Sequence, residues 1–244
     1  MERSICVSSD NVFNDLLDYC NNAGHPLVVG QSVGVLNTSD TQYIIQPKPL
    51  GLRGLSLTDV LHVFLARRIG SANLKSVAAF DILGEALWKA TEKVFFESHC
   101  LMGFKQERKQ CFALRGRVNF AQQLQKHGHL CAPAWCTYST LTEDIDLNRI
   151  VKRALRHMLK ALSDPELHGC LSFFCDVYLS KVSSGLDDTD EICWNKLNAA
   201  YRPLIEISFF ILKHVWFADS TPNLLFSAYD VFHEYVQFAV QNDL

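Results

Sequence analysis

The chain has 244 residues, of which 48% are hydrophobic and 20% are charged. These proportions are typical of a folded globular protein with one large domain or two small ones. The formal net charge of -3 at pH 7 excludes a chain that is basic throughout, so any contact with nucleic acid has to come from a local basic patch.

Cysteine usage indicates a reducing compartment. The nine cysteines form no CxxC pair, and the chain shows neither a secretory signal nor an apolar run long enough to cross a membrane. We therefore expect a cytoplasmic protein without structural disulfides. His127, His129, Cys131 and Cys136 carry zinc-ligand side chains, but their crowding does not match the usual paired spacing. We expect no metal site there, and we expect the cysteines to be small buried hydrophobic residues.

The N-terminal part of the chain predicts a short helix and a small sheet. Asn11 to Tyr19 has apolar residues at helical spacing. The β-rich runs Leu27 to Val29, Val33 to Leu36 and Tyr43 to Gln46 are separated by polar turns, which is typical of antiparallel strands. We interpret residues 1–55 as a β-rich unit.

Nucleotide binding by this chain alone is not expected. Gly30 and Gly34 lie where a glycine-rich loop could form, but the sequence contains no GxxxxGK[ST] motif. The usual cradle for phosphates is therefore missing.

The rest of the chain predicts an α+β fold with a mainly helical body at residues 56–222. Apolar periodicity indicates helices at Ser56 to Ile69, about Ala78 to Ser98, Leu147 to Leu162, Pro165 to Ser183 and Tyr201 to Trp216. A final helix is expected at about Leu224 to Val240, within a C-terminal segment 223–244. We also expect one or two β-hairpins, with Leu101 to Gln106 paired against Gln110 to Leu114 and a turn at Glu107-Arg108.

The most basic surface is predicted along the helix that begins near Leu147. Its apolar stripe is opposed by a charged face that consists of Arg149, Lys152, Arg153, Arg156 and Lys160. Such a face binds nucleic acid in some proteins, but a charged helix face is more commonly just solvated.

Arg115-Gly116-Arg117 is a candidate phosphate contact. Two guanidinium groups flank a residue without a side chain at the end of a predicted strand, Cys111 to Leu114. Arginine matches phosphate oxygens with two parallel hydrogen bonds, and glycine lets the backbone approach closely. The alternative is a turn glycine between two solvated arginines. A structural role for the arginines, paired with Glu143, Asp144 or Asp146, is a further alternative.

Glu107-Arg108-Lys109 has the Glu-x-Lys spacing found at metal-dependent nuclease sites. Such a site needs a second carboxylate from a neighbouring strand, and three charged residues at a hairpin tip are usually a solvated turn. We therefore assign no catalytic residue.

The order of these motifs resembles a known family. The segment LRGRVNFAQQL, followed by LTEDIDLNRIVKRALRHML, is similar to the McrC family, the partner subunits of McrB-type GTPases in modified-cytosine-dependent restriction systems. The similar positions are Leu114 to Arg117, Asp144 to Asp146 and Asn148 to Lys152. A weaker similarity includes Gly34, Pro47 and Lys48, so the resemblance extends from Gly30 onward.

The resemblance implies an antiviral defence subunit that docks on an McrB-like AAA GTPase, stimulates it and couples it to DNA containing modified cytosine. GTP and Mg²⁺ are then expected on the partner, with no cofactor in this chain and no membrane contact. The residues that would contact DNA or the partner are Arg115, Gly116, Arg117, Asn148, Arg149, Lys152, Arg153 and Lys48.

The family continues into a nuclease domain of the Asp…(Asp/Glu)-x-Lys class, and nothing follows Leu244 here. We therefore expect no catalysis by this chain alone. Two alternatives remain: an endonuclease subunit whose active site is unrecognised or supplied by a separate chain, and an accessory protein that binds DNA.

Overall fold

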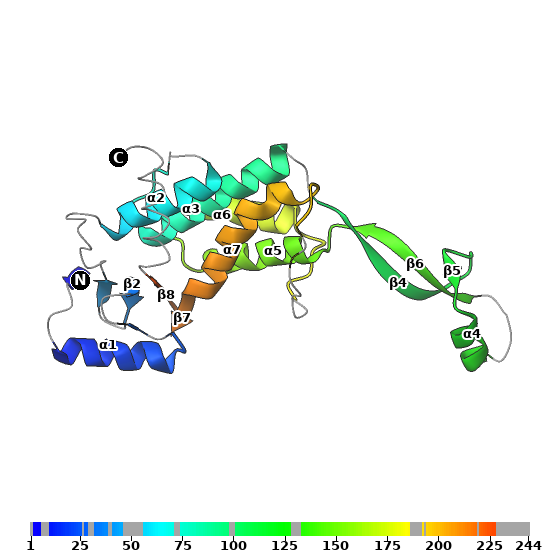
Figure 1. Ribbon diagram of the computed structural model, residues 1–244, viewed down its shortest axis with the longest axis horizontal. Helices are drawn as coiled ribbons and strands as arrows, with labels where there is room; N and C mark the ends of the chain where they lie inside the picture. Colours follow the sequence, from blue (N-terminus) through cyan, green and yellow to red (C-terminus); the bar gives the residue numbers. More distant parts are fainter. Residues whose placement is uncertain are drawn as a thin grey trace.

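A computed structural model describes residues 2–5, 10–25, 27–28, 32–38, 41–45, 56–70, 74–97, 101–127, 133–185, 192, 194–218 and 220–227. The described chain has a central helical body, a sheet at one end and a long projecting ribbon at the other (Figure 1). The predicted α+β class is confirmed. No helix among the described residues is long and apolar enough to span a membrane.

The helical body consists of α2 (Leu57–Ile69), α3 (Ala79–Glu92), α5 (Asp146–Met158), α6 (Pro165–Val177) and α7 (Arg202–His214). A π-helical turn (Lys93–Glu97) continues α3, and a short 3-10 turn (Ala199–Tyr201) precedes α7. The apolar faces meet in one core, where Leu83, Leu155 and Ile207 are fully buried. The predicted spacing of apolar residues therefore identified the faces that pack together.

Helix ends follow local sequence signals. The Ser56 hydroxyl accepts a hydrogen bond from the Asp59 backbone N–H, and the Asp59 carboxylate accepts one from the Ser56 backbone N–H. This reciprocal capping starts α2 at the predicted residue. Gly70 ends the helix in the left-handed conformation, as the Arg-Arg-Ile-Gly sequence indicates.

The sheet joins both ends of the chain. Its order is β1 (Glu2–Ile5), β3 (Gln42–Ile45), β2 (Ser32–Asn37), β8 (Thr221–Ser227) and β7 (Val215–Ala218). The β1–β3 pair is parallel and the other pairs are antiparallel. Helix α1 (Asp10–Asn22) contributes Leu16 and Cys20 to a small second core with Trp216 and Leu225. The N-terminal strands are thus completed by strands from the other end of the chain.

Gly34 has a packing role in this sheet. A Cβ atom at this position would collide with the carbonyl oxygen of Leu224 on β8. Gly34 therefore permits close pairing of β2 with β8.

The predicted hairpin turn at Glu107-Arg108 is wrong. Strand β4 (Gly103–Cys111) runs straight through these residues and pairs along its whole length with β6 (Ala134–Thr142). None of the residues from Gln106 to Lys109 is a turn former, so nothing local interrupts the extended chain. Residues 112–114, predicted as strand, follow the end of β4.

The predicted helix from Leu224 is wrong for the described part. Residues 224–227 belong to β8, and Leu224 to Phe226 are buried. A short apolar run fits a strand or a helix equally well, and pairing with β2 and β7 decides between them.

Two other predicted elements also differ from the structure. The helix predicted to run to Trp216 is α7, which ends at His214, and Val215 and Trp216 begin β7. A strand was also predicted at Leu27 to Val29. Leu27 and Val28 do not belong to a strand, and Val29 lies outside the described residues.

Candidate functional site

The feature that stands out from the body is an arm (residues 103–142). It contains β4, β5 (Arg117–Val118), α4 (Phe120–His127) and β6. Strands β4 and β6 form a two-stranded ribbon that extends away from the helices, and β5 and α4 lie at its far end (Figure 1). Two of the family-like motifs fall at opposite ends of this arm. Arg115-Gly116-Arg117 is at the tip, and Asp144 to Lys152 is at the base.

The base of the arm is held by Asn148 of α5. Its side-chain amide donates hydrogen bonds to the carbonyl oxygens of Leu101 (3.0 Å), before β4, and Glu143 (2.8 Å), after β6. The backbone N–H of Leu101 donates to the hydroxyl of the buried Tyr201 at 2.8 Å. One helix residue thus holds both strands of the ribbon.

Arg149 and Asp144 form the second part of this base. The Nε and Nη2 atoms of Arg149 each donate to the Asp144 carboxylate at 2.8 Å. Asp144 also accepts a hydrogen bond from the backbone N–H of Ser183 at 2.9 Å. The Arg149 guanidinium holds the pKa of Asp144 well below its ordinary value, because it stabilises the charged form. The pair ties the end of β6 to the segment that follows α6.

Lys152 completes the base with an internal contact. The residue is 5% exposed, and Nζ donates hydrogen bonds to the carbonyl oxygens of Leu179 (2.6 Å) and Val182 (2.5 Å). A cation is favourable at this position because unpaired carbonyl groups gather just after the end of a helix. We call Asp144, Asn148, Arg149 and Lys152 the socket of the arm.

The prediction that Arg149 and Lys152 lie on a solvent-facing basic surface is therefore wrong. Arg149 is 8% exposed, whereas Arg153 and Arg156 on the same helix are exposed. The helix periodicity placed all of these residues outside the apolar stripe, but the arm base and the end of α6 cover one edge of that polar face. The cover comes from residues distant in sequence, so the helix pattern alone could not show it.

At the tip, Gly116 brings the chain onto β6. Its φ angle is +62°, and a Cβ atom would collide with the carbonyl oxygen of Thr137. The close approach that the glycine permits is thus to the neighbouring strand, a packing role that the sequence did not indicate. Arg115 and Arg117 on either side of it are exposed.

Strand register places Arg117 in a row with Arg108, which was predicted to lie in a solvated turn. Thr137 of β6 is opposite Arg108 on β4 and opposite Arg117 on β5. Residues directly opposite in antiparallel strands project to the same face, so both arginines lie on one face of the arm. We call Arg108, Thr137 and Arg117 the arginine row. The alternation of side chains along β4 indicates on which face of the ribbon Arg108 lies, but it does not indicate which strand pairs with β4.

The opposite face of the ribbon carries the charge-paired residues. Lys109 Nζ lies 2.7 Å from the carboxylate of Glu107, and the Tyr138 hydroxyl donates to the same carboxylate at 3.1 Å. Glu107 is thus an ion-pair partner in the middle of a strand. Among the described residues, no group of three or more histidine, cysteine or acidic side chains is placed to hold a metal ion. His129, Cys131 and Lys48 lie outside the described residues.

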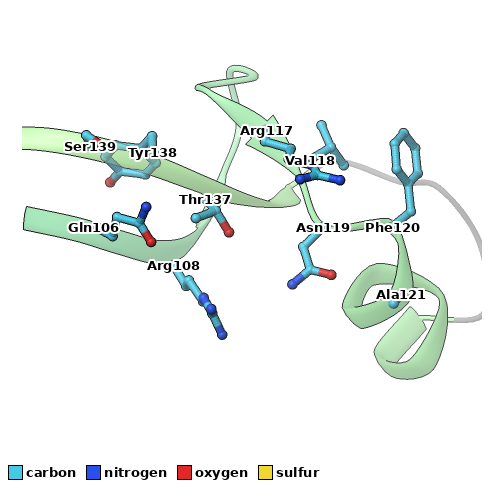
Figure 2. Close-up of a pocket in the computed structure, with 10 residues that line it drawn as sticks. All are labelled: Gln106, Arg108, Arg117, Val118, Asn119, Phe120, Ala121, Thr137, Tyr138 and Ser139. Carbon is cyan, nitrogen blue, oxygen red and sulfur yellow. The ribbon is translucent and has the colours of Figure 1, made fainter.

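The arginine row borders a cavity of about 810 Å³. Figure 2 shows Arg108 and Arg117 on either side of Thr137, with the start of α4 beside them. The lining residues are Gln106, Arg108, Arg117, Val118, Asn119, Phe120, Ala121, Thr137, Tyr138 and Ser139. None of the described residues that line the cavity is acidic.

Helix α4 packs in an unusual orientation. Gln123 is fully buried, and its side-chain oxygen accepts a hydrogen bond from the backbone N–H of Trp135 at 2.9 Å. Phe120 and Leu124, one helical turn apart, are instead exposed. The helix therefore turns a polar residue inward and presents apolar side chains to its surroundings.

The loop after β4 also exposes large apolar side chains. Phe112 is 87% exposed and Leu114 is 72% exposed. We call Phe112, Leu114 and Leu124 the tip patch. Large apolar side chains exposed on a projecting element are typical of a surface that another protein covers.

Comparison with protein families identifies the chain's relatives. The family described as "McrBC 5-methylcytosine restriction system component" matches residues 27–243. The chain belongs to this family. The match includes the entire arm and its socket. A comparison with curated proteins finds no significant match.

Two solved structures share the fold of this McrBC-family chain. The cryo-EM structure of the Thermococcus gammatolerans McrBC complex matches with a TM-score of 0.60 and 13% identity, over 86% of this chain and 65% of the matched chain. A half-complex from a tetradecameric assembly of Thermococcus gammatolerans McrB AAA+ hexamers with bound McrC matches with a TM-score of 0.58 and 14% identity, over 87% and 53%. The chain therefore spans about half to two thirds of the length of these relatives.

Proposed function

We propose that this McrBC-family chain is an McrC-like subunit that docks on an McrB-like AAA GTPase, stimulates GTP hydrolysis and couples the GTPase to DNA. The observation that carries the proposal is the arm. It projects from the body, is held by charged and polar contacts at its base, and ends in the exposed tip patch. An element of this shape can reach into a partner while the body remains outside.

The choice of partner is supported by the relatives. One structure with the same fold comes from an assembly of McrB AAA+ hexamers with bound McrC. Burial of large apolar side chains is a major source of binding energy in protein interfaces, and the arm presents such side chains far from the body. GTP and Mg²⁺ would reside on the partner.

The DNA contact is supported by unpaired positive charge on the arm. Arg108, Arg115 and Arg117 are exposed, and no ion pair joins them to an acidic residue in the described part of the chain. Arginines in this state are available for phosphate groups. Asn148, Arg149 and Lys152, in contrast, would act indirectly by orienting the arm.

The test is GTP hydrolysis by the McrB-like partner from the same source, measured with and without this chain. We expect the Phe112→Ser, Leu114→Ser double variant to lose at least tenfold in apparent affinity for the partner, because two apolar contacts each contribute on the order of 1–3 kcal/mol to an interface of this kind.

The matched control is the Val77→Ser, Leu197→Ser double variant, which removes two similarly exposed apolar side chains from the body. It should stimulate hydrolysis as the unaltered chain does. Full stimulation by the Phe112, Leu114 variant would exclude the tip patch as the docking surface. Mg²⁺-dependent DNA cleavage by the isolated chain would favour the endonuclease alternative instead.

A further inference from the structure

We propose that the cavity beside the arginine row binds one nucleotide of a single-stranded nucleic acid. This inference deepens the DNA coupling included in the proposed function and rests on it. The site is distinct from the tip patch, because Phe112, Leu114 and Leu124 are not among the residues that line the cavity.

The arginine row supplies the phosphate end of this site. Arg108 and Arg117 flank Thr137 on neighbouring strands, so two strand spacings, about 10 Å, separate their backbones. Long side chains from both sides can converge on one phosphate group or contact two successive ones. Each guanidinium offers a planar pair of donors that matches phosphate oxygens.

Charge separation between the two faces of the ribbon keeps this end positive. Glu107, the nearest acidic residue along β4, projects to the opposite face and is paired with Lys109 and Tyr138 there. Neither Arg108 nor Arg117 has a salt-bridge partner among the described residues. An anionic ligand would therefore meet cations that no internal carboxylate neutralises.

The rest of the lining suits a base and a sugar. Phe120, at the start of α4, borders the cavity and is 56% exposed, so its ring is available for stacking. Gln106 and Ser139 are paired across β4 and β6 on the same face as the arginine row and present amide and hydroxyl groups. An aromatic ring beside a basic groove is the arrangement by which proteins bind unstacked bases.

Cavity size favours a single strand over a duplex. A volume of about 810 Å³ lies within the range of sites for small molecules, and it matches one nucleotide rather than a helix. Bases in a duplex are stacked on each other and cannot reach Phe120. An acidic peptide would use the arginines but would leave the aromatic ring unused.

The experiment measures binding of the isolated full chain to a fluorescein-labelled oligothymidylate by fluorescence anisotropy over a range of salt concentrations. We expect the Arg108→Gln, Arg117→Gln double variant to bind at least tenfold more weakly and with a smaller salt dependence, because each lost phosphate contact lowers the salt slope by roughly one. Phe120→Ala should weaken binding by roughly 5- to 100-fold through loss of stacking.

The matched control is the Arg156→Gln, Arg202→Gln double variant, which removes the same charge from exposed positions on the body and should bind normally. Equal affinity for duplex DNA, or full binding by Phe120→Ala, would overturn the assignment of an unstacked base. Binding of free GTP without binding of the strand would overturn the assignment of a strand. Competition by polyglutamate as effective as that by the unlabelled strand would also overturn it, in favour of a protein ligand.

No GTPase is present in this assay, so the result is separate from the docking test. The Phe112→Ser, Leu114→Ser variant should bind the oligonucleotide normally while failing to stimulate the partner. Absence of strand binding by the unaltered chain would overturn the nucleotide site and leave the docking proposal standing.

Discussion

The base and the tip of the arm contain the same residue types but use them differently. At the base, Arg149 and Lys152 are buried and bonded to a carboxylate or to backbone carbonyl groups. At the tip, Arg108 and Arg117 are exposed beside a cavity. A basic residue in a family-like motif can therefore hold an element in place or present charge to a ligand, depending on what packs against it.

The largest expected effect is at the base. Arg149→Ala should lower the free energy of unfolding by about 3–5 kcal/mol, because it leaves Asp144 partly buried without its main partner. Urea unfolding followed by circular dichroism measures this change.

Arg153→Ala is the matched control, since Arg153 lies on the same helix but is exposed. Its effect should stay within about 0.5 kcal/mol. Equal destabilisation by the two substitutions would contradict the assignment of Arg149 to the socket.

A smaller effect is expected from acid. The folded-state pKa of Asp144 lies well below the ordinary value of 3.8, so its charged form stabilises the folded state. This contribution is fully present above about pH 4 and is lost as the pH falls through the folded-state pKa. The stability of the unaltered chain should therefore fall more steeply in acid than that of Asp144→Asn.

Unfolding in urea at about pH 6 and about pH 3 measures this difference. Asp176→Asn, at an exposed position on α6, should keep the steep dependence of the unaltered chain. Identical acid dependence for Asp144→Asn and the unaltered chain would show that the Arg149 contact does not control this titration.

The smallest effect on stability is expected at the tip. The Arg115→Ala, Arg117→Ala double variant should unfold within about 0.5 kcal/mol of the unaltered chain, because exposed arginines contribute little to folding. It should nevertheless lose salt-sensitive DNA association or stimulation of the partner, since phosphate contacts contribute to binding.

Thermal unfolding and binding have to be measured on the same preparation of this variant. Substantial destabilisation would make the two arginines structural, and the distinction between base and tip would then disappear.

Local sequence signals determined the helices of the body and indicated the family. The Ser56 cap, the apolar spacing of α5 and the Asp164-Pro165 start of α6 depend on residues within a few positions of each other, so they can be read directly from the chain. The motif order around Arg115 to Arg117 and Asn148 to Lys152 indicated the family for the same reason.

Tertiary structure alone decided what these motifs do. The straight course of β4, the strand at Leu224, the burial of Lys152 and the alignment of Arg108 and Arg117 on either side of Thr137 each depend on partners distant in sequence. Strand pairing and burial are set by which surfaces meet, and residue spacing within one segment contains no information about the other surface. The sequence by itself therefore determined the helices of the body, whereas the pairing of β6 with β4 and β5 decided where the unpaired arginines lie.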